Sequence, residues 1–179
     1  FVVDDQGGRG LVDFNFNGWG NKQTHANDTL VADELSYQTK ATYISSQLTG
    51  EGGGIEIDGH GTAIMTESCW VNSNRNPGMT RSQIEAELKA NLGLRKIIWL
   101  PGIKDKDITD AHVDFYARFA SKGVVIANLD NDPKSYDYAV TRKHLDILKA
   151  ATDADGNKLQ VFTLPPPLKK RSNVYTQNN

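Results

Sequence analysis

The residues of this sequence best suited to chemistry are a histidine and an aspartate two positions apart, His112 and Asp114. They stand at the head of an apolar run that we expect to form a strand over 113–120. Because side chains alternate between the two faces of a strand, the imidazole and the carboxylate would point the same way. A proton carrier beside an anion is typical of sites that hold a cationic substrate. A simpler alternative is an ion pair between Asp114 and Arg118.

A second acidic motif, Glu51 followed by three glycines, precedes an ordered series of predicted elements. Apolar runs predict the strands, and a capping box that begins at Thr80, with a stop at Gly93, predicts a helix. In chain order the elements are strands over 55–57 and 62–66, a helix over 80–92 and a strand over 96–100. The glycines beside Glu51 would let the backbone approach a ligand closely.

The same series returns further along the chain. Its elements are strands over 113–120 and 124–128, a helix over 138–151 and a strand over 159–164. Near the N-terminus, a strand over 12–16, a helix over 28–38 and a strand over 41–45 look like a unit without its opening strand. Copies roughly sixty residues apart are typical of radial or stacked arrays, in which equivalent strand starts converge on one centre. We therefore expect Glu51, His112 and Asp114 to lie together.

Four segments resemble the agmatine deiminase and bacterial-type peptidyl-arginine deiminase family. They are Glu51 to Ile55 (EGGGI), Thr66 to Pro77 (TESCWVNSNRNP), Ile97 to Gly102 (IIWLPG) and Asp107 to Phe119 (DITDAHVDFYARF). The resemblance runs from Phe1 to about Leu168. It implies an α/β fold, the five-bladed α/β propeller (pentein) of strand-strand-helix-strand units. It also implies hydrolysis of a guanidino group to a ureido group, with release of ammonia through a cysteine-thiouronium intermediate and without a cofactor.

This resemblance makes the chain a single partial catalytic domain, cut inside the array of units. Residues 1–46 would be the end of one unit, 51–100 a second unit, 110–168 a third and 169–179 the start of the next. An aspartate upstream of Phe1 and a nucleophilic cysteine near the family's C-terminus would complete the site. The 179 residues alone would then be inactive.

The resemblance also implies a role for each matching position. His112 would protonate the leaving amine and then activate water, with Glu51 orienting its imidazole. Asp114 would bind the planar guanidinium through two parallel hydrogen bonds. Trp19 would contact the substrate, or else simply pack. Ala111 stands where the family usually has glycine, and it would strain the backbone if the position needs a positive φ.

The substrate is expected to be agmatine, converted to N-carbamoylputrescine. The segment over 16–22 lacks the arginines with which the peptidyl-arginine branch holds a carboxylate, and it looks like the agmatine branch instead. Two alternatives stay open: a peptidyl-arginine deiminase, and a non-catalytic module that binds guanidino compounds. The sequence of the downstream cysteine motif would distinguish an enzyme from a module.

Several other reactive residues favour structural roles. We expect Cys69 to pack as a small hydrophobe, buried away from the cavity, since it lies in an apolar run. His144 is expected at a helix surface, and Arg75 to pair with a carboxylate for structural reasons. We expect no metal site, because the spacing among Asp58, His60, His112 and Asp114 matches no known set of ligands.

The composition argues against nucleic acid and membranes as binding partners. A formal net charge of −2 offers no basic patch for nucleic acid. No apolar run approaches twenty residues, so we expect no membrane span. One cysteine excludes an internal disulfide and suits a reducing compartment such as the cytoplasm. The expected partner is a small guanidino compound, and a homo-oligomer stays open.

Overall fold

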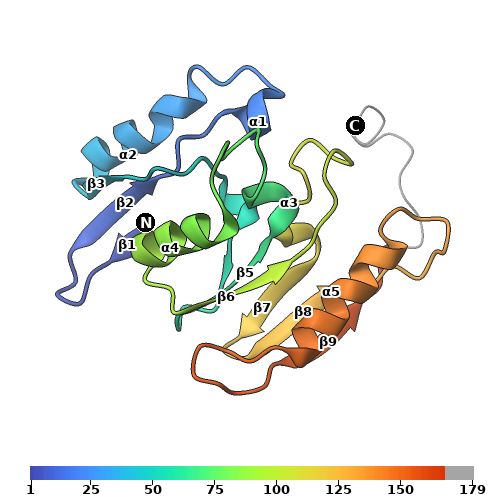
Figure 1. The fold of residues 1–179 in the computed structure, drawn as a ribbon. Coiled ribbons are helices and arrows are strands. Elements are labelled where there is room, and N and C mark those ends of the chain that lie inside the picture. Colours follow the sequence, from blue (N-terminus) through green and yellow to red (C-terminus); the bar gives the residue numbers. More distant parts are fainter. Residues whose placement is uncertain (168–179) are drawn as a thin grey trace.

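Three small sheets follow one another in chain order in the computed structural model, which describes residues 1–167 (Figure 1). The strands are β1 (Val2–Val3), β2 (Arg9–Asp13) and β3 (Thr42–Ser45) in the first sheet, β4 (Glu56–Ile57), β5 (Thr62–Thr66) and β6 (Lys96–Leu100) in the second, and β7 (Ala117–Ser121), β8 (Val124–Asn128) and β9 (Gln160–Leu164) in the third. In each sheet the middle strand pairs antiparallel with the first strand and parallel with the third.

A helix connects each parallel pair, as a crossover between parallel strands requires. The α-helices are α1 (Gly18–Asn21), α2 (Val31–Thr39), α3 (Glu67–Trp70), α4 (Arg81–Leu92) and α5 (Tyr138–Ala150). Short 3-10 turns are η1 (Asp28–Leu30), η2 (Gly52–Gly54) and η3 (Val113–Phe115). The repeated series of strand, strand, helix and strand is therefore confirmed.

The predicted start and end of the helix in the second unit are confirmed. The Thr80 hydroxyl accepts from the Gln83 amide at 3.3 Å, and the Gln83 side chain accepts from the Thr80 amide at 2.9 Å. Both orphan donors at the start of α4 are thus satisfied. Gly93 ends the helix with a φ of 63°, which glycine adopts without a steric penalty. In the first unit the prediction was wrong on two points: β1 supplies a short opening strand, and the strand expected over 12–16 is β2, which covers Arg9–Asp13.

Helices α4 and α5 cover the two faces of the second sheet. Ile84 and Leu88 of α4 pack with Ala63 and Met65, which lie on one face of the second sheet. The other face of that sheet packs against α5 and the third sheet, in a cluster that contains Ile64, Ile98, Leu100, Val125, Ala127 and Leu148. Both faces of the second sheet are therefore covered, and this packing holds the second and third units together.

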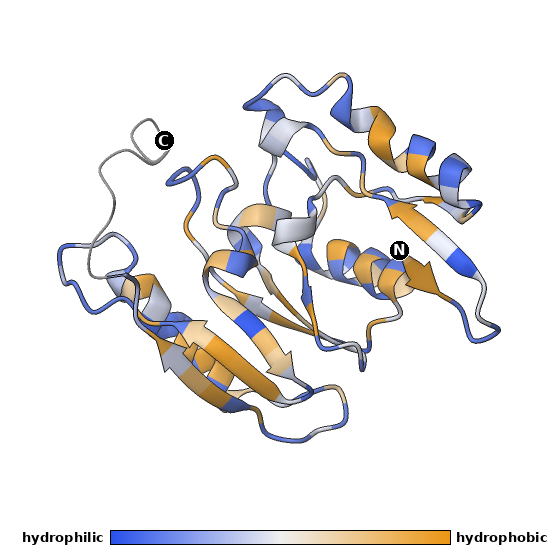
Figure 2. Cartoon of the chain, turned by 180° about the vertical axis from the view of Figure 1, so that it is seen from behind, coloured by the Kyte–Doolittle hydropathy of each residue, from blue (hydrophilic) through white to orange (hydrophobic). Residues whose placement is uncertain are grey.

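The two ends of the stack expose apolar side chains. On the third sheet, Ile126, Phe162 and Leu164 are 40%, 50% and 62% exposed. The strands of this sheet consist largely of hydrophobic residues (Figure 2). At the other end, Leu35 and Tyr37 of α2 are exposed. Among residues 1–167, no helix is both long and apolar enough to cross a membrane.

The structure differs from the sequence analysis in the segment around His112 and at His144. The strand predicted over 113–120 begins only at Ala117, since the amides of Phe115 and Tyr116 bond back to the carbonyls of His112 and Val113 and close the 3-10 turn η3. The argument that His112 and Asp114 share a strand face therefore does not apply.

The ion pair between Asp114 and Arg118, considered above as an alternative, does not form, because Arg118 binds Glu56 at 2.8 Å. His144 is 1% exposed instead of lying at the helix surface, because the face of α5 that carries it points inward. The unit expected to start at 169–179 lies outside the described residues.

Candidate active site

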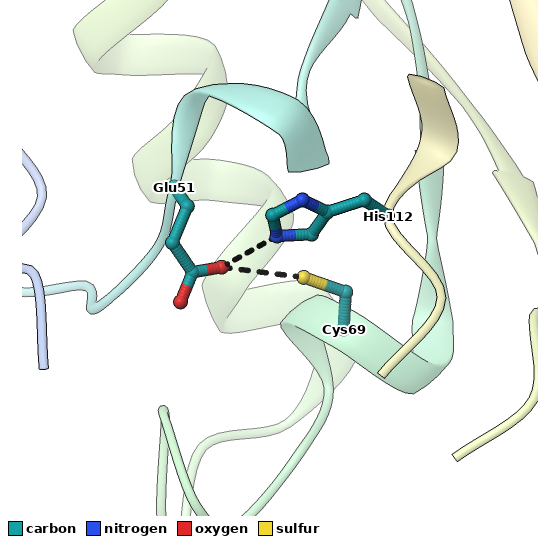
Figure 3. A group of neighbouring side chains, drawn as sticks. All are labelled: Glu51, Cys69 and His112. Atoms are coloured by element: carbon teal, nitrogen blue, oxygen red, sulfur yellow. Dashed lines mark hydrogen bonds and ion pairs between the residues drawn. The ribbon is translucent and has the colours of Figure 1, made fainter. Parts of the chain in front are cut away.

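Glu51 and His112 meet although they come from different units. Glu51 immediately precedes η2, and His112 immediately precedes η3. The His112 Nε2 lies 3.0 Å from the Glu51 Oε2 (Figure 3). Both side chains are almost fully buried, at 6% and 8% exposed. The proximity predicted from the repeat is therefore observed.

One of the three glycines, Gly53, is required by lack of space. A Cβ at this position would overlap the His112 Nδ1 and would lie 2.9 Å from the Asp114 Oδ2. His112 and Asp114 therefore both lie over the same glycine, with the Nδ1 edge of the ring on the side of the Asp114 carboxylate. At Gly52 a Cβ would meet nothing within 4 Å. Of these two positions, only Gly53 needs glycine for space.

Arg75 is buried and forms an ion pair with Glu51. Its Nε donates to the Glu51 Oε1 at 2.8 Å, and its Nη1 donates to the Asp110 Oδ2 at 2.8 Å. The Nη2 donates to the Thr109 carbonyl at 2.9 Å. Burial raises the pKa of Glu51, but hydrogen bonds and charges from His112 and Arg75 outweigh it, so the pKa lies below its ordinary value. The carboxylate is therefore ionised at neutral pH.

Asp110 extends this network to α1. Its fully buried carboxylate accepts from Lys22 Nζ at 2.8 Å, from the Asn74 side chain at 2.9 Å and from the Asp105 amide at 3.0 Å. Burial raises the pKa of Asp110, but these donors and Arg75 hold it well below its usual range. Sequence analysis missed Asp110 and gave Arg75 only a structural role. The signal available was their position in two of the family-like segments.

A cavity of about 750 Å³ opens over the Glu51–His112 pair. Its acidic lining residues are Asp13, Asp28, Glu51 and Asp114. Aromatic residues line it as well, and Trp19 contacts Phe16 edge-on at a ring distance of 5.3 Å. Within the described residues 1–167, no lysine or arginine lines this cavity. The cavity is therefore suited to a cation with an apolar stem.

The amino-acid sequence matches the Porphyromonas-type peptidyl-arginine deiminase family over residues 1–178. The chain belongs to this family. It is 38% identical to the agmatine deiminase of Stutzerimonas stutzeri over 173 residues, which cover 93% of this chain and 47% of that protein. It is 38% identical to the agmatine deiminase of Medicago truncatula over 162 residues, or 87% and 43% of the two chains.

Solved structures agree with this assignment. The structure of the agmatine deiminase of Enterococcus faecalis superposes with a TM-score of 0.87 at 32% identity, covering 93% of this chain and 47% of that one. The Porphyromonas gingivalis member of the arginine deiminase group superposes with a TM-score of 0.80 at 31% identity, covering 88% and 48%. The chain spans about half the length of the curated relatives it matches.

Cys69 lies beside the site, which corrects the prediction that it is buried away from it. The residue is fully buried in α3, and its Sγ lies 3.7 Å from the Glu51 Oε2 (Figure 3). The prediction failed because the apolar run ends in a helical turn that brings the thiol under Glu51. Burial raises the pKa of the Cys69 thiol strongly. A thiol that stays protonated is a weak nucleophile.

Ala111 has a positive φ of 69°, and its neighbour Asp110 has a φ of 60°. The sequence prediction that an alanine here strains the backbone is therefore supported by its conformation. The Ala111 carbonyl accepts from the Thr66 hydroxyl at 2.6 Å, and the Asp110 carbonyl accepts from the Ser68 hydroxyl at 2.7 Å. These bonds hold the segment in place just before His112.

Proposed function

We propose that the protein carrying these residues hydrolyses agmatine to N-carbamoylputrescine and ammonia. The observation that carries the proposal is a cavity with four carboxylates, one buried imidazole and no basic lining residue in the described part of the chain. A guanidinium with a second cationic group suits such a lining, whereas a substrate carboxylate would find no cation to bind. The family membership and the agmatine deiminase relatives support the same choice.

Asp114 is the proposed anchor for the guanidinium. Its exposed carboxylate faces the cavity, and no ion pair forms with it among residues 1–167. Arg118, the nearest cation in sequence, is held by Glu56 instead. A carboxylate can receive two parallel charge-assisted hydrogen bonds from a planar guanidinium. Asp28 also lines the cavity and forms no ion pair within the described part of the chain, and it is the proposed partner of the substrate's ammonium group.

His112 is the proposed proton carrier. Its Nε2 is engaged by Glu51, which leaves Nδ1, on the Asp114 side, to exchange protons with the substrate. An ionised carboxylate on Nε2 stabilises the imidazolium and sets the ring orientation. Trp19 would contact the aliphatic stem of agmatine. In this proposal Arg75 keeps Glu51 ionised and in position, so it is a positioning residue.

The proposed reaction has two steps. A cysteine thiolate attacks the guanidinium carbon, His112 gives its proton to the leaving nitrogen of the tetrahedral adduct, and ammonia departs to leave a thiouronium intermediate. Water then attacks that carbon, His112 takes one water proton, and the carbon–sulfur bond breaks to restore the thiolate, while the second water proton passes to the released ammonia through solvent. Because Cys69 is fully buried and its pKa is raised, we assign the nucleophile to a part of the family domain beyond these 179 residues.

We also propose that the three sheets are part of a five-bladed propeller. The second sheet is covered on its far face by the helix of the following unit, whereas the far face of the third sheet exposes Phe162 and Leu164. A further unit would cover them. In the natural full-length protein, Phe162→Cys should then react slowly with a maleimide, while the control Lys149→Cys on exposed α5 surface reacts fast. Equal rates would contradict this arrangement.

The activity is tested by ammonia release from agmatine, free arginine and an arginine-containing peptide, with the natural full-length protein. Agmatine should be the preferred substrate. A preference for the peptide would assign the protein to the other branch, and no release from any substrate would favour a binding module.

The role of Asp114 is tested in the same assay. Asp114→Asn should raise KM and cut turnover by orders of magnitude, because hydrogen bonds to charged groups contribute roughly 1.5–3 kcal/mol before any transition-state effect. Asp146→Asn, at an exposed position of α5, is the matched control and should leave both constants unchanged. Equal kinetics for the two variants would overturn the assignment of Asp114.

A further inference from the structure

Three potential metal ligands of different chemical type converge beneath the cavity. The ligand atoms of Glu51, Cys69 and His112 all lie within 4.8 Å of one another (Figure 3). The Glu51 Oε2 is 3.0 Å from the His112 Nε2 and 3.7 Å from the Cys69 Sγ. All three side chains are buried, at 8%, 0% and 6% exposed for Glu51, Cys69 and His112. No other such group is found within residues 1–167.

We infer that Glu51, Cys69 and His112 form a site for one thiophilic divalent cation of the zinc class. A carboxylate oxygen, a thiolate and an imidazole nitrogen are the donors that zinc takes, at about 2.0–2.3 Å each. Tetrahedral ligands at such distances lie about 3–4 Å apart, which the spacings to the Glu51 Oε2 already match. Three protein ligands leave a fourth position for water.

The environment provides access, orientation and charge balance. Glu51 and His112 line the cavity, so the cation can enter from it. The Arg75 Nε donates to the Glu51 Oε1 at 2.8 Å and, at the longer distance of 3.1 Å, to Oε2, so it fixes the direction of the carboxylate. Oε2 is the oxygen that faces the His112 Nε2 and the Cys69 Sγ, and it is the proposed metal ligand. When the sulfur–metal bond forms, the Cys69 proton is released to solvent. The thiolate and Glu51 then offset the two charges of the cation, while Asp110 pairs with both Arg75 and Lys22.

Occupation of this site would inhibit the enzyme, a consequence that rests on the proposed function. A metal on Nε2 displaces the Glu51–His112 hydrogen bond, and its charge opposes protonation of the ring and entry of a guanidinium. The binding itself does not depend on any reaction. The site thus differs from the cluster of Asp58, His60, His112 and Asp114 considered from the sequence, and it uses the cysteine that the proposed mechanism leaves free.

The test is direct metal binding to the natural full-length protein. Zinc affinity is measured by competition with a chromogenic chelator, and cobalt binding by the ultraviolet absorption of a thiolate-to-cobalt bond. Cys69→Ser and Cys69→Ala should each weaken zinc binding by about tenfold or more, since even the loss of an outer hydrogen bond to a ligand costs 10–100-fold. Both should also abolish the thiolate–cobalt absorption. His60→Ala, at an exposed histidine, is the control and should bind as wild type does.

Two outcomes would overturn the inference. One is a thiolate–cobalt band that persists in both Cys69 variants, because the metal would then sit on another thiol. The other is zinc affinity unchanged by either substitution. In activity assays, the zinc concentration for half inhibition should rise about tenfold or more in Cys69→Ala, relative to its own uninhibited rate. Zinc binding without agmatine turnover would refute the proposed function alone, and turnover without zinc binding would refute only this site.

Discussion

Two buried histidines of this chain lie in opposite electrostatic environments. His112 is bonded to Glu51, a carboxylate that Arg75 keeps ionised. His144 packs edge-on against the Tyr116 ring at 4.7 Å and accepts only from the Gly102 amide at 3.1 Å. Its Nδ1 is buried and has no hydrogen-bond partner among residues 1–167. Burial therefore does not define the site, because only the histidine that is buried with an anion is suited to carry a proton.

The largest effect on stability is expected from removing Arg75, the cation that holds the carboxylate bonded to His112. Arg75→Met removes the guanidinium that Glu51 and Asp110 share and leaves the buried Glu51 with His112 and the buried Asp110 with Lys22, which should cost about 3–5 kcal/mol of unfolding free energy. Urea unfolding of the natural protein measures this cost. Arg81→Met is the control, since Arg81 pairs with Glu67 at a side-chain exposure of 55%, and it should cost at most about 1 kcal/mol. Equal costs would show that the buried network is not what holds Glu51.

The burial of His144 without an anion should make the stability of the protein depend on pH. Burial lowers the pKa of His144 from its ordinary value of 6.5 to about 4. Between these values the unfolded chain binds more protons than the folded one, so stability is complete above about pH 6.5 and falls as the pH falls toward 4. The loss attributable to His144 should reach about 3.5 kcal/mol at most, since one pKa unit corresponds to about 1.4 kcal/mol.

The measurement for His144 is a difference between two proteins. Unfolding of wild type and of His144→Gln is followed at pH values across this window, and the variant should show the flatter profile. Taking the difference removes the contribution of carboxylates that titrate in the same range. Parallel profiles for the two proteins would mean that His144 is not neutral in the folded state.

The next largest effect on stability is expected from filling the space beside His112. Gly53→Ala places a methyl group on the His112 ring, and overpacking of this kind costs about 1–3 kcal/mol. It should also lower turnover of the full-length protein, because the ring would move off Glu51. Gly52→Ala is the matched control, as a Cβ there meets nothing within 4 Å. If both variants unfold and react alike, the close approach of Gly53 to His112 has no importance for the site.

The smallest effect should be stabilising. Ala111 has a φ of 69°, a conformation that glycine adopts more readily, so Ala111→Gly should raise the unfolding free energy by up to about 1 kcal/mol. Ala117→Gly, at a buried position of β7, should instead lower it. Thermal unfolding of the two variants decides the sign. A destabilised Ala111→Gly would mean that its methyl group contributes more through packing than it costs in strain.

The sequence alone was sufficient for the features that depend on neighbouring residues. The capping box at Thr80, the stop at Gly93 and the strands over 62–66 and 96–100 arise from hydrogen bonds and side-chain periods within a few positions, so local patterns reveal them. The repeat of units, together with the resemblance, also indicated that Glu51 and His112 would meet.

Only the tertiary structure decided which groups surround them. Arg75 lies 24 positions from Glu51 and 35 from Asp110, and no spacing along the chain predicts that one guanidinium joins both. The proximity of Cys69 to Glu51 likewise depends on how α3 packs under the loop before η2. The physical reason is that buried charges need partners, and these partners are brought together by packing between units, which local patterns do not encode.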